Sequence, residues 1–209
     1  MVYFLIFISA IFVNNIVLSQ FLGICPFLGV SKKIDTALGM SAAVTFVLTV
    51  ATVVTYLLQQ LLMTMGEGIF GDKTTFLFLQ TILFILIIAA LVQMIEIILK
   101  KISPSLYQAL GVFLPLITTN CCILGVALIV ADQQKLLAKL PLGADYGLLS
   151  GTIYAFATAI GFGLALILFA GIREQLALAK VPKAMQGTPI ALLTAGLLAM
   201  AFMGFSGVV

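Results

Sequence analysis

Long apolar runs with almost no charged residues are the feature that most constrains what this chain can fold into. Short charged clusters separate six such runs, which cover about residues 2–30, 36–62, 74–99, 106–130, 150–171 and 189–208. A membrane-spanning helix needs roughly 20 consecutive apolar residues, whereas a barrel strand needs about ten residues of alternating polarity. Because these runs are apolar throughout, the sequence predicts an all-α integral membrane protein with six transmembrane helices.

The composition leaves little room for any other domain. Of the 209 residues, 63% are hydrophobic and 8% are charged, against about a quarter charged in soluble domains. We therefore expect no soluble domain and no binding of ATP, NAD or nucleic acid by this chain alone. The chain has no histidine, which excludes haem and zinc sites with imidazole ligands. The first run has no basic segment before it, so we expect it to stay in the mature protein.

The basic residues are distributed unevenly between alternate loops. If the loops alternate sides, one side receives three lysines, and the other receives Lys32, Lys33, Lys100, Lys101, Arg173, Lys180 and Lys183. The positive-inside rule places the more basic side in the cytoplasm. The sequence therefore predicts that both termini face the outer, periplasmic side. We expect Arg173 and Glu174 to open a basic loop that offers a surface to lipid headgroups or a peripheral protein.

A short motif occurs twice, at an offset of 96 residues. Cys25 begins C-P-F-L-G-V in the first run, and Cys121 begins C-C-I-L-G-V in the fourth, so that both copies share C-x-x-L-G-V. Each half of the chain then contains three spans, and an odd number inserts the second half upside down. We predict two inverted three-helix repeats in one membrane domain, residues 1–104 and residues 105–209.

Both copies of the motif lie where a helix is expected to break. Pro26 follows Cys25 between two glycines, and a proline followed by Thr-Thr-Asn precedes Cys121. Proline removes a helical hydrogen bond, and irregular backbone at membrane depth is tolerated only inside protein. Unbroken helices would hold the two thiols apart, whereas breaks in helices 1 and 4 would let them converge. We expect Pro26 to begin a half-helix capped by Cys25, and Asn120 to cap the half-helix that begins at Cys121.

Two half-helices in this arrangement would point their positive dipole ends at the cysteine sulfurs. This stabilises thiolates and anionic groups bound to them. An iron-sulfur cluster with four cysteine ligands is such a group, and the two cysteines of this chain would supply half of the ligands. The alternative is that all three cysteines are small buried apolar residues, as cysteine often is.

Two other classes of function fit the same architecture. A secondary transporter also has inverted repeats with broken helices, but it is expected to present polar or ionisable groups at the breaks, where this chain presents thiols. A protein with a purely structural role in an assembly would not need its cysteines. The cysteines therefore discriminate among the three hypotheses.

A few polar residues within the spans allow two interpretations each. Asn14 and Asn15 lie in the middle of the first run, where helix–helix contact is favoured over ion passage. Glu96 lies four residues before Lys100, and an interfacial pair is favoured over a functional intramembrane acid. The glycines within residues 161–163 are expected to serve helix packing rather than nucleotide binding.

Five sequence blocks resemble the family formed by the A-type protein of the Rnf electron-transport complex and the E-type protein of the Na⁺-translocating NADH:quinone reductase. They are V-N-N at 13–15, F-L-G-I-C-P-F-L-G-V-S-K-K at 21–33, L-G-V-F-L-P-L-I-T-T-N-C at 110–121, G-I-R-E at 171–174 and A-F-M-G-F-S-G at 201–207. The resemblance covers essentially the whole chain. The pairs at 14–15 and 25–26 are closer to the Rnf member, and the quinone-reductase member is the alternative.

The resemblance implies a membrane component of an ion-translocating (Na⁺ or H⁺) ferredoxin:NAD⁺ oxidoreductase in the bacterial cytoplasmic (inner) membrane. It implies a [2Fe-2S] cluster shared with a homologous six-helix protein of opposite orientation, the Rnf E-type subunit, with two cysteines from each chain. Matched by motif, the iron ligands here are Cys25 and Cys121. Cys122 matches Pro26 in the repeat and is expected to serve packing, although it is also a rival ligand.

The implied mechanism is a one-electron relay across the membrane. The chain contains no catalytic residues of its own and no complete active site, so it is one part of an enzyme. Flavin, nicotinamide and ferredoxin would bind to the other Rnf proteins, of the B, C, D and G types, and membrane lipid would surround the helices.

Overall fold

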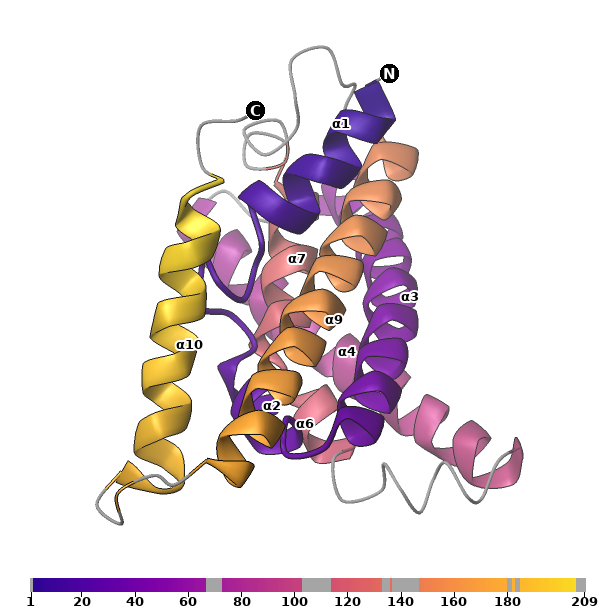
Figure 1. Cartoon of the computed structure of the whole chain (residues 1–209). Coiled ribbons are helices and arrows are strands. Elements are labelled where there is room, and N and C mark those ends of the chain that lie inside the picture. Colours follow the sequence, from indigo (N-terminus) through magenta and orange to yellow (C-terminus); the bar gives the residue numbers. More distant parts are fainter. Residues whose placement is uncertain are drawn as a thin grey trace.

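The structure is a computed structural model that describes residues 2–66, 73–102, 114–132, 136, 147–179, 182 and 185–205. Within these ranges the regular secondary structure is helical and contains no strand (Figure 1). The predicted all-α class is thereby confirmed. The expected start of the fourth run, at about residue 106, and most of the loop between residues 131 and 149 lie outside the described residues.

Among the described residues, three helices are long and apolar enough to cross a membrane. They are α3 (Ile34–Gly66), α4 (Lys73–Ile102) and α9 (Leu148–Leu178), and they correspond to the second, third and fifth apolar runs. The sixth run forms the shorter helix α10 (Thr188–Met203). The first and fourth runs do not form single helices.

The first and fourth runs are interrupted, as the sequence predicts. The first comprises α1 (Val2–Ile8), the π-helix η1 (Ser9–Val13), a non-helical segment, and α2 (Ile24–Val30). The described part of the fourth comprises α6 (Leu114–Thr118) and α7 (Cys121–Ala131), with two residues between them. We refer to residues 14–23 as the first break and to residues 119–120 as the second break.

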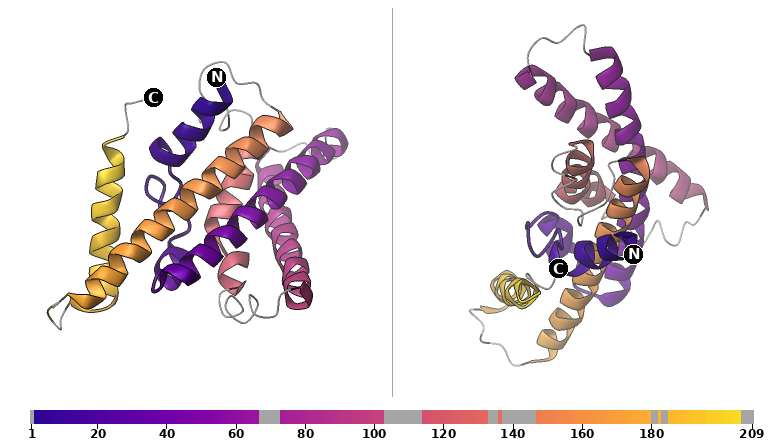
Figure 2. Two further views of the ribbon diagram at one scale, coloured as in Figure 1. Left: turned by 45° about the vertical axis from the view of Figure 1, so that its right-hand side comes forward. Right: turned by 90° about the horizontal axis from the view of Figure 1, so that it is seen from above.

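Helices α3 and α9 pack against each other over much of their length and form the centre of the fold (Figure 2). Small residues face this contact. Gly163 of α9 approaches α3 so closely that a Cβ atom there would lie 3.0 Å from the Ser41 Cβ. Helices in lipid gain stability mainly from van der Waals contact, which such close backbone approach increases. The packing role predicted for the glycines at residues 161–163 is confirmed.

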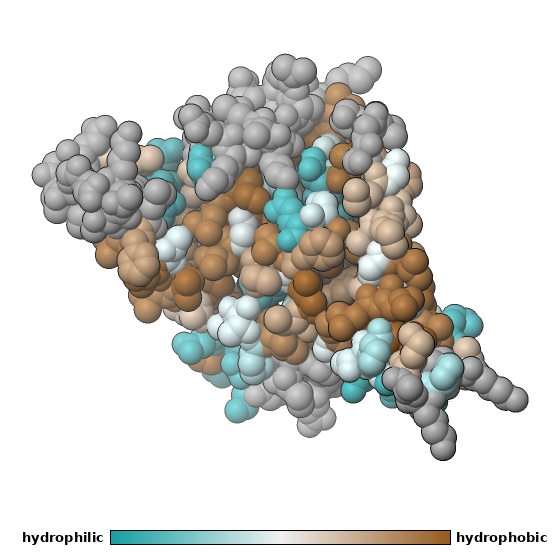
Figure 3. Space-filling view, turned by 90° about the vertical axis from the view of Figure 1, so that its left-hand side faces the viewer, coloured by the Kyte–Doolittle hydropathy of each residue, from teal (hydrophilic) through white to brown (hydrophobic). Residues whose placement is uncertain are grey.

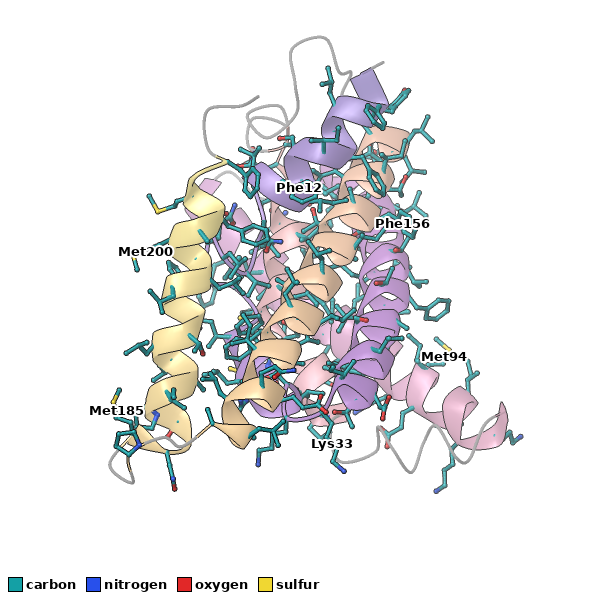
Figure 4. All side chains as sticks on the ribbon, viewed as in Figure 1. Phe12, Lys33, Met94, Phe156, Met185 and Met200 are labelled. Carbon is teal, nitrogen blue, oxygen red and sulfur yellow. The ribbon has the colours of Figure 1, made fainter. Side chains whose placement is uncertain are left out.

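Helices α4 and α10 lie at the edge of the bundle. Only 17% of the most apolar stretch of α4 is buried, against 61% of that of α9. On α10, Met200 is exposed and points away from the other helices (Figure 4). Apolar residues cover most of the middle of the face that contains α10, and hydrophilic residues gather mainly near its lower edge (Figure 3). An exposed apolar band of this kind is typical of a chain surrounded by lipid.

Most of the helix ends that carry basic residues lie at one end of the molecule, although Lys73 begins α4 at the other end. Helix α3 begins there next to Lys33, and α4 and α9 end there, whereas α1 begins and α10 ends at the opposite end (Figures 1 and 4). The end of α9 differs from the prediction, because the helix continues from Gly171 to Leu178. Its last residues, R-E-Q-L-A-L, are good helix formers, so the loss of apolar character does not end the helix. Arg173 and Glu174 therefore lie in a helix and not in a loop.

Candidate metal centre at two helix breaks

Asn15 holds the first break in place. Its side-chain Nδ2 donates hydrogen bonds to the carbonyl oxygens of Ile11, at 3.0 Å, and Gly161, at 2.9 Å. Its Oδ1 accepts hydrogen bonds from the backbone N–H groups of Val17, at 3.1 Å, and Leu18, at 3.4 Å. Asn15 is only 1% exposed. One buried side chain thus satisfies three backbone groups of the interrupted first run at membrane depth, and its fourth bond ties the break to α9.

The bond between Asn15 and α9 is the helix–helix contact that the sequence favours for this residue. The neighbouring Asn14 donates from its side chain to the Ser9 hydroxyl at 3.2 Å. Gly161 permits the approach, because a Cβ atom there would lie 3.1 Å from the Ile11 Cα and 3.2 Å from the Ala10 carbonyl oxygen. The first break therefore rests directly on the backbone of α9.

Gly23 begins the half-helix that carries Cys25. It is the N-cap of α2, with φ of +83°. The prediction that Cys25 caps this helix is wrong, since Cys25 is its second residue and Pro26 its third. Glycine adopts a positive φ without steric cost, so the chain turns into the helix two residues earlier than expected. Proline is tolerated at this position because the first N–H groups of a helix have no intrahelical partner.

Asn120 caps the second half-helix, as predicted. Its Oδ1 accepts a hydrogen bond from the backbone N–H of Cys122 at 3.0 Å, and α7 begins at Cys121. The side chain is 3% exposed. Within the part of the chain that the structure describes, its Nδ2 has no hydrogen-bond partner. Both motif cysteines therefore lie in the first turn of a half-helix.

The structure brings the two breaks into contact. The backbone N–H of Gly23 donates a hydrogen bond to Cys121 Sγ at 3.0 Å, although 98 residues separate them in the chain. A Cβ atom on Gly23 would also lie 3.3 Å from Asn120 Oδ1 and 3.2 Å from Cys122 Cβ. Cys25 follows Gly23 by two residues. The beginnings of α2 and α7 therefore lie in contact.

The glycines of the two motif copies make a second, reciprocal contact. A Cβ atom on Gly29 would lie 3.5 Å from Leu116 Cδ1, in the segment that precedes the second motif. A Cβ atom on Gly125 would lie 2.7 Å from Leu22 Cδ1, in the segment that precedes the first motif. Each copy of the motif thus packs on the chain that leads into the other copy.

The three cysteines have different surroundings. Cys25 and Cys121 are exposed, whereas Cys122 is fully buried. A shared metal group needs thiols that a second protein can reach, so the two exposed cysteines fit such a site and Cys122 does not. Among the described residues, no three histidine, cysteine or acidic side chains lie together as metal ligands. If a four-thiolate cluster binds here, the remaining ligands must come from elsewhere.

Arg173 contributes to the site in a way that sequence reasoning missed. From α9, its Nη1 donates hydrogen bonds to the Leu28 carbonyl oxygen and to the Ser31 hydroxyl oxygen, both at 2.8 Å. Its guanidinium carbon lies 5.7 Å from the centre of the Phe169 ring, which stacks on Phe27 of α2 at 4.2 Å. Basic side chains stabilise the carbonyl ends of helices. Arg173 thus fixes the C-terminal end of the half-helix that carries Cys25.

The signal for this role was available in the sequence but ambiguous. An arginine directly after an apolar run marks either the beginning of a loop or a basic side chain that turns back onto the bundle. Glu96 of α4 is half-buried, and its pairing with Lys100 stays a prediction.

Comparison with known proteins agrees with the resemblance that the sequence blocks indicate. A family model described as "Rnf-Nqr subunit, membrane protein" matches residues 3–209. The A subunit of the Na⁺-translocating ferredoxin:NAD⁺ oxidoreductase complex of Acetobacterium woodii is 57% identical over 202 residues, which are 97% of this chain and 95% of that relative. The A subunit of the ion-translocating oxidoreductase complex of Syntrophotalea carbinolica is 54% identical over 205 residues, 98% of this chain and 96% of the relative. The corresponding protein of Ectopseudomonas mendocina is 50% identical over the same shares of both chains. The chain belongs to the Rnf-Nqr family of membrane protein subunits.

Proposed function

We propose that this chain is the A-type membrane component of an ion-translocating ferredoxin:NAD⁺ oxidoreductase. Its identity of 57% to a relative with that name, over nearly the full length of both chains, supports the assignment. The chain is one subunit of an enzyme complex and contributes an electron-relay site to it. The main support for the relay function is the contact between Gly23 and Cys121, which joins two half-helices that each present an exposed thiol.

We infer that Cys25 and Cys121 hold half of a [2Fe-2S] cluster. The bound cluster would supply one-electron transfer, and thiolate sulfur is its usual ligand. A homologous six-helix protein of opposite orientation, the Rnf E-type subunit, would provide two further cysteines. The exposure of both thiols supports this sharing. The burial of Cys122 leaves it to pack against its neighbours rather than to bind iron.

We further propose that the fold is an inverted repeat of two three-helix units, residues 1–104 and residues 105–209. The interruption of the first and fourth runs at matching copies of C-x-x-L-G-V supports it, as do the reciprocal contacts of Gly29 and Gly125. Six spans follow if α1 with α2, and α6 with α7, each cross the membrane once. Transporters place their binding sites at such paired breaks near the midplane.

The orientation follows from the same arrangement. The end of the molecule where α4 and α9 end would face the cytoplasm, and the beginning of α1 and the end of α10 would face the periplasm. The relay site lies between these ends, so electrons would cross the bacterial inner membrane through it. Carriers on the Rnf proteins of the B, C, D and G types would deliver and accept them, and lipid would surround the exposed faces of α4 and α10.

The test is replacement of each cysteine by serine in the assembled complex. In Cys25→Ser and Cys121→Ser variants we expect loss of the [2Fe-2S] EPR signal, about two fewer iron atoms per complex, and at least a roughly hundredfold loss of ferredoxin-dependent NAD⁺ reduction. Cys122→Ser is the matched control, and we expect it to keep iron and activity. An unchanged cluster in the Cys25 and Cys121 variants would overturn the ligand assignment.

A further inference from the structure

One hydrogen bond of the site comes from the backbone and not from a side chain. The N–H of Gly23 donates to Cys121 Sγ at 3.0 Å. Sequence patterns do not reveal such a bond, because any residue except proline carries a backbone N–H. Its importance depends on what fixes the direction of that N–H group.

The position of the Gly23 N–H is fixed from two sides. The Gly23 carbonyl oxygen accepts a hydrogen bond from the Phe27 N–H at 3.2 Å, which ties Gly23 to the first turn of α2. Its Cα lies against buried atoms, since a Cβ atom there would lie 2.9 Å from Phe162 Cε2 and 3.2 Å from Cys122 Cβ. The φ of +83° also disfavours any residue with a side chain. Glycine is therefore required to hold the amide against Cys121.

An N–H donor to a ligating sulfur changes the reduction potential of the metal group. Reduction adds negative charge to the cluster and its thiolates, and a hydrogen bond from a backbone dipole stabilises that charge. The reduced form is stabilised more than the oxidised form, so the bond raises the reduction potential. The donor comes from the first half of the chain and the acceptor from the second, so the potential depends on the contact between the halves.

We propose that Gly23 is a positioning residue that sets the reduction potential of the metal group bound by Cys121, through the hydrogen bond from its backbone N–H to Cys121 Sγ. This inference rests on the proposed function, because it needs Cys121 to be a cluster ligand. It assigns to the first break a role beyond presenting Cys25.

The first test replaces Gly23 by alanine in the complete complex and measures the midpoint potential of the cluster by EPR-monitored redox titration. The Gly23→Ala variant must leave the left-handed region or displace Phe162, and either change moves the N–H away from the sulfur. We expect its equilibrium constant for reduction to fall about tenfold, a shift of about 59 mV to more negative potential for a one-electron couple. The matched control is Gly29→Ala in the same half-helix, where a Cβ atom has ordinary contacts and the potential should not change. Equal potentials in the two variants would overturn the proposal.

A second measurement needs no variant that must fold. In wild-type complex labelled with ¹⁵N-glycine, pulsed EPR of the reduced cluster should detect a weak coupling to a glycine nitrogen, transmitted through the hydrogen bond. In an assembled Gly23→Ala complex this coupling should weaken or disappear. Absence of any glycine coupling in the wild type contradicts the proposal.

The proposed function and the role of Gly23 fail in different ways. If the Cys121→Ser variant keeps its cluster, the ligand assignment of the proposed function is wrong. If that variant loses its cluster but the wild type shows no glycine coupling, the proposed function stands and only the role of Gly23 is wrong.

Discussion

The two helix breaks reach one arrangement by different local chemistry. The first is ten residues long, is organised by the buried side chain of Asn15, and enters α2 through a glycine with positive φ. The second is two residues long and enters α7 through an asparagine N-cap. Both end in a half-helix with an exposed cysteine in its first turn. The two copies of the motif thus place their cysteines alike, but different residues and hydrogen bonds stabilise the backbone of the two breaks.

The two breaks depend on their surroundings to different degrees. The half-helix α2 has seven residues, too few to be stable alone, and is held at its end by Arg173 of α9. The half-helix α7 has eleven residues, and much of it is buried against other helices. We therefore expect the first break to be the more vulnerable, and three substitutions of graded severity test this.

The largest effect is expected at Asn15. An Asn15→Leu substitution keeps the number of side-chain heavy atoms. It leaves the Ile11 carbonyl and the N–H groups of Val17 and Leu18 without the amide that pairs with them, and it breaks the bond to Gly161 of α9. Each unsatisfied buried group costs about 1–3 kcal/mol, so we expect the free energy of unfolding to fall by about 3 kcal/mol or more. Denaturant titration of the purified complex in mixed micelles measures this free energy of unfolding.

The control for this substitution is Thr194→Val on α10. The Thr194 hydroxyl bonds to carbonyl oxygens of its own helix, so its loss should cost little. If Asn15→Leu is no more harmful than Thr194→Val, the first break does not depend on Asn15.

A smaller effect is expected at Arg173. An Arg173→Ala variant loses two hydrogen bonds from a charged donor to the end of α2, and we expect a loss of stability of about 2 kcal/mol. Hydrogen exchange should become faster at the amides of α2 and stay unchanged at those of α7. Gln175→Ala, an exposed position two residues further along α9, is the matched control. Equal acceleration in α2 and α7 would show that Arg173 stabilises the bundle in general.

Much of the fold could be predicted from the sequence, because the length of an apolar run directly reflects the thickness of the membrane. The bounds of α3 and α4 and the beginning of α10 follow the apolar runs closely, whereas α10 ends at Met203, about five residues before the predicted end. The true limits of the first break could not be found in this way. Its residues from Ile16 to Leu18 are buried apolar residues, indistinguishable by composition from helix, and only the hydrogen bonds of Asn15 reveal the interruption.

The candidate site was partly predictable for a related reason. The cysteines and the cap at Asn120 follow from residue type and spacing, which are local properties. The contact of Gly23 with Cys121 and the bonds of Arg173 to α2 join residues 98 and 145 positions apart. Such contacts depend on how the helices pack, and this packing cannot be derived from a single sequence. The end of α9 was missed because a helix ends for reasons of capping rather than polarity.

The smallest effect is expected at Asn120, because its side chain accepts a single hydrogen bond, from the Cys122 N–H. Loss of an N-cap costs about 1 kcal/mol, so Asn120→Ala should destabilise the complex by about that amount, well below Asn15→Leu. Asn120→Ser keeps an acceptor for the Cys122 N–H and removes the buried Nδ2, which has no partner among the described residues. We therefore expect Asn120→Ser to equal or slightly exceed the wild type in stability, measured in the same denaturant titration. If both variants instead lose as much as Asn15→Leu, the two breaks are equally dependent on one side chain, and their difference in length has no energetic meaning.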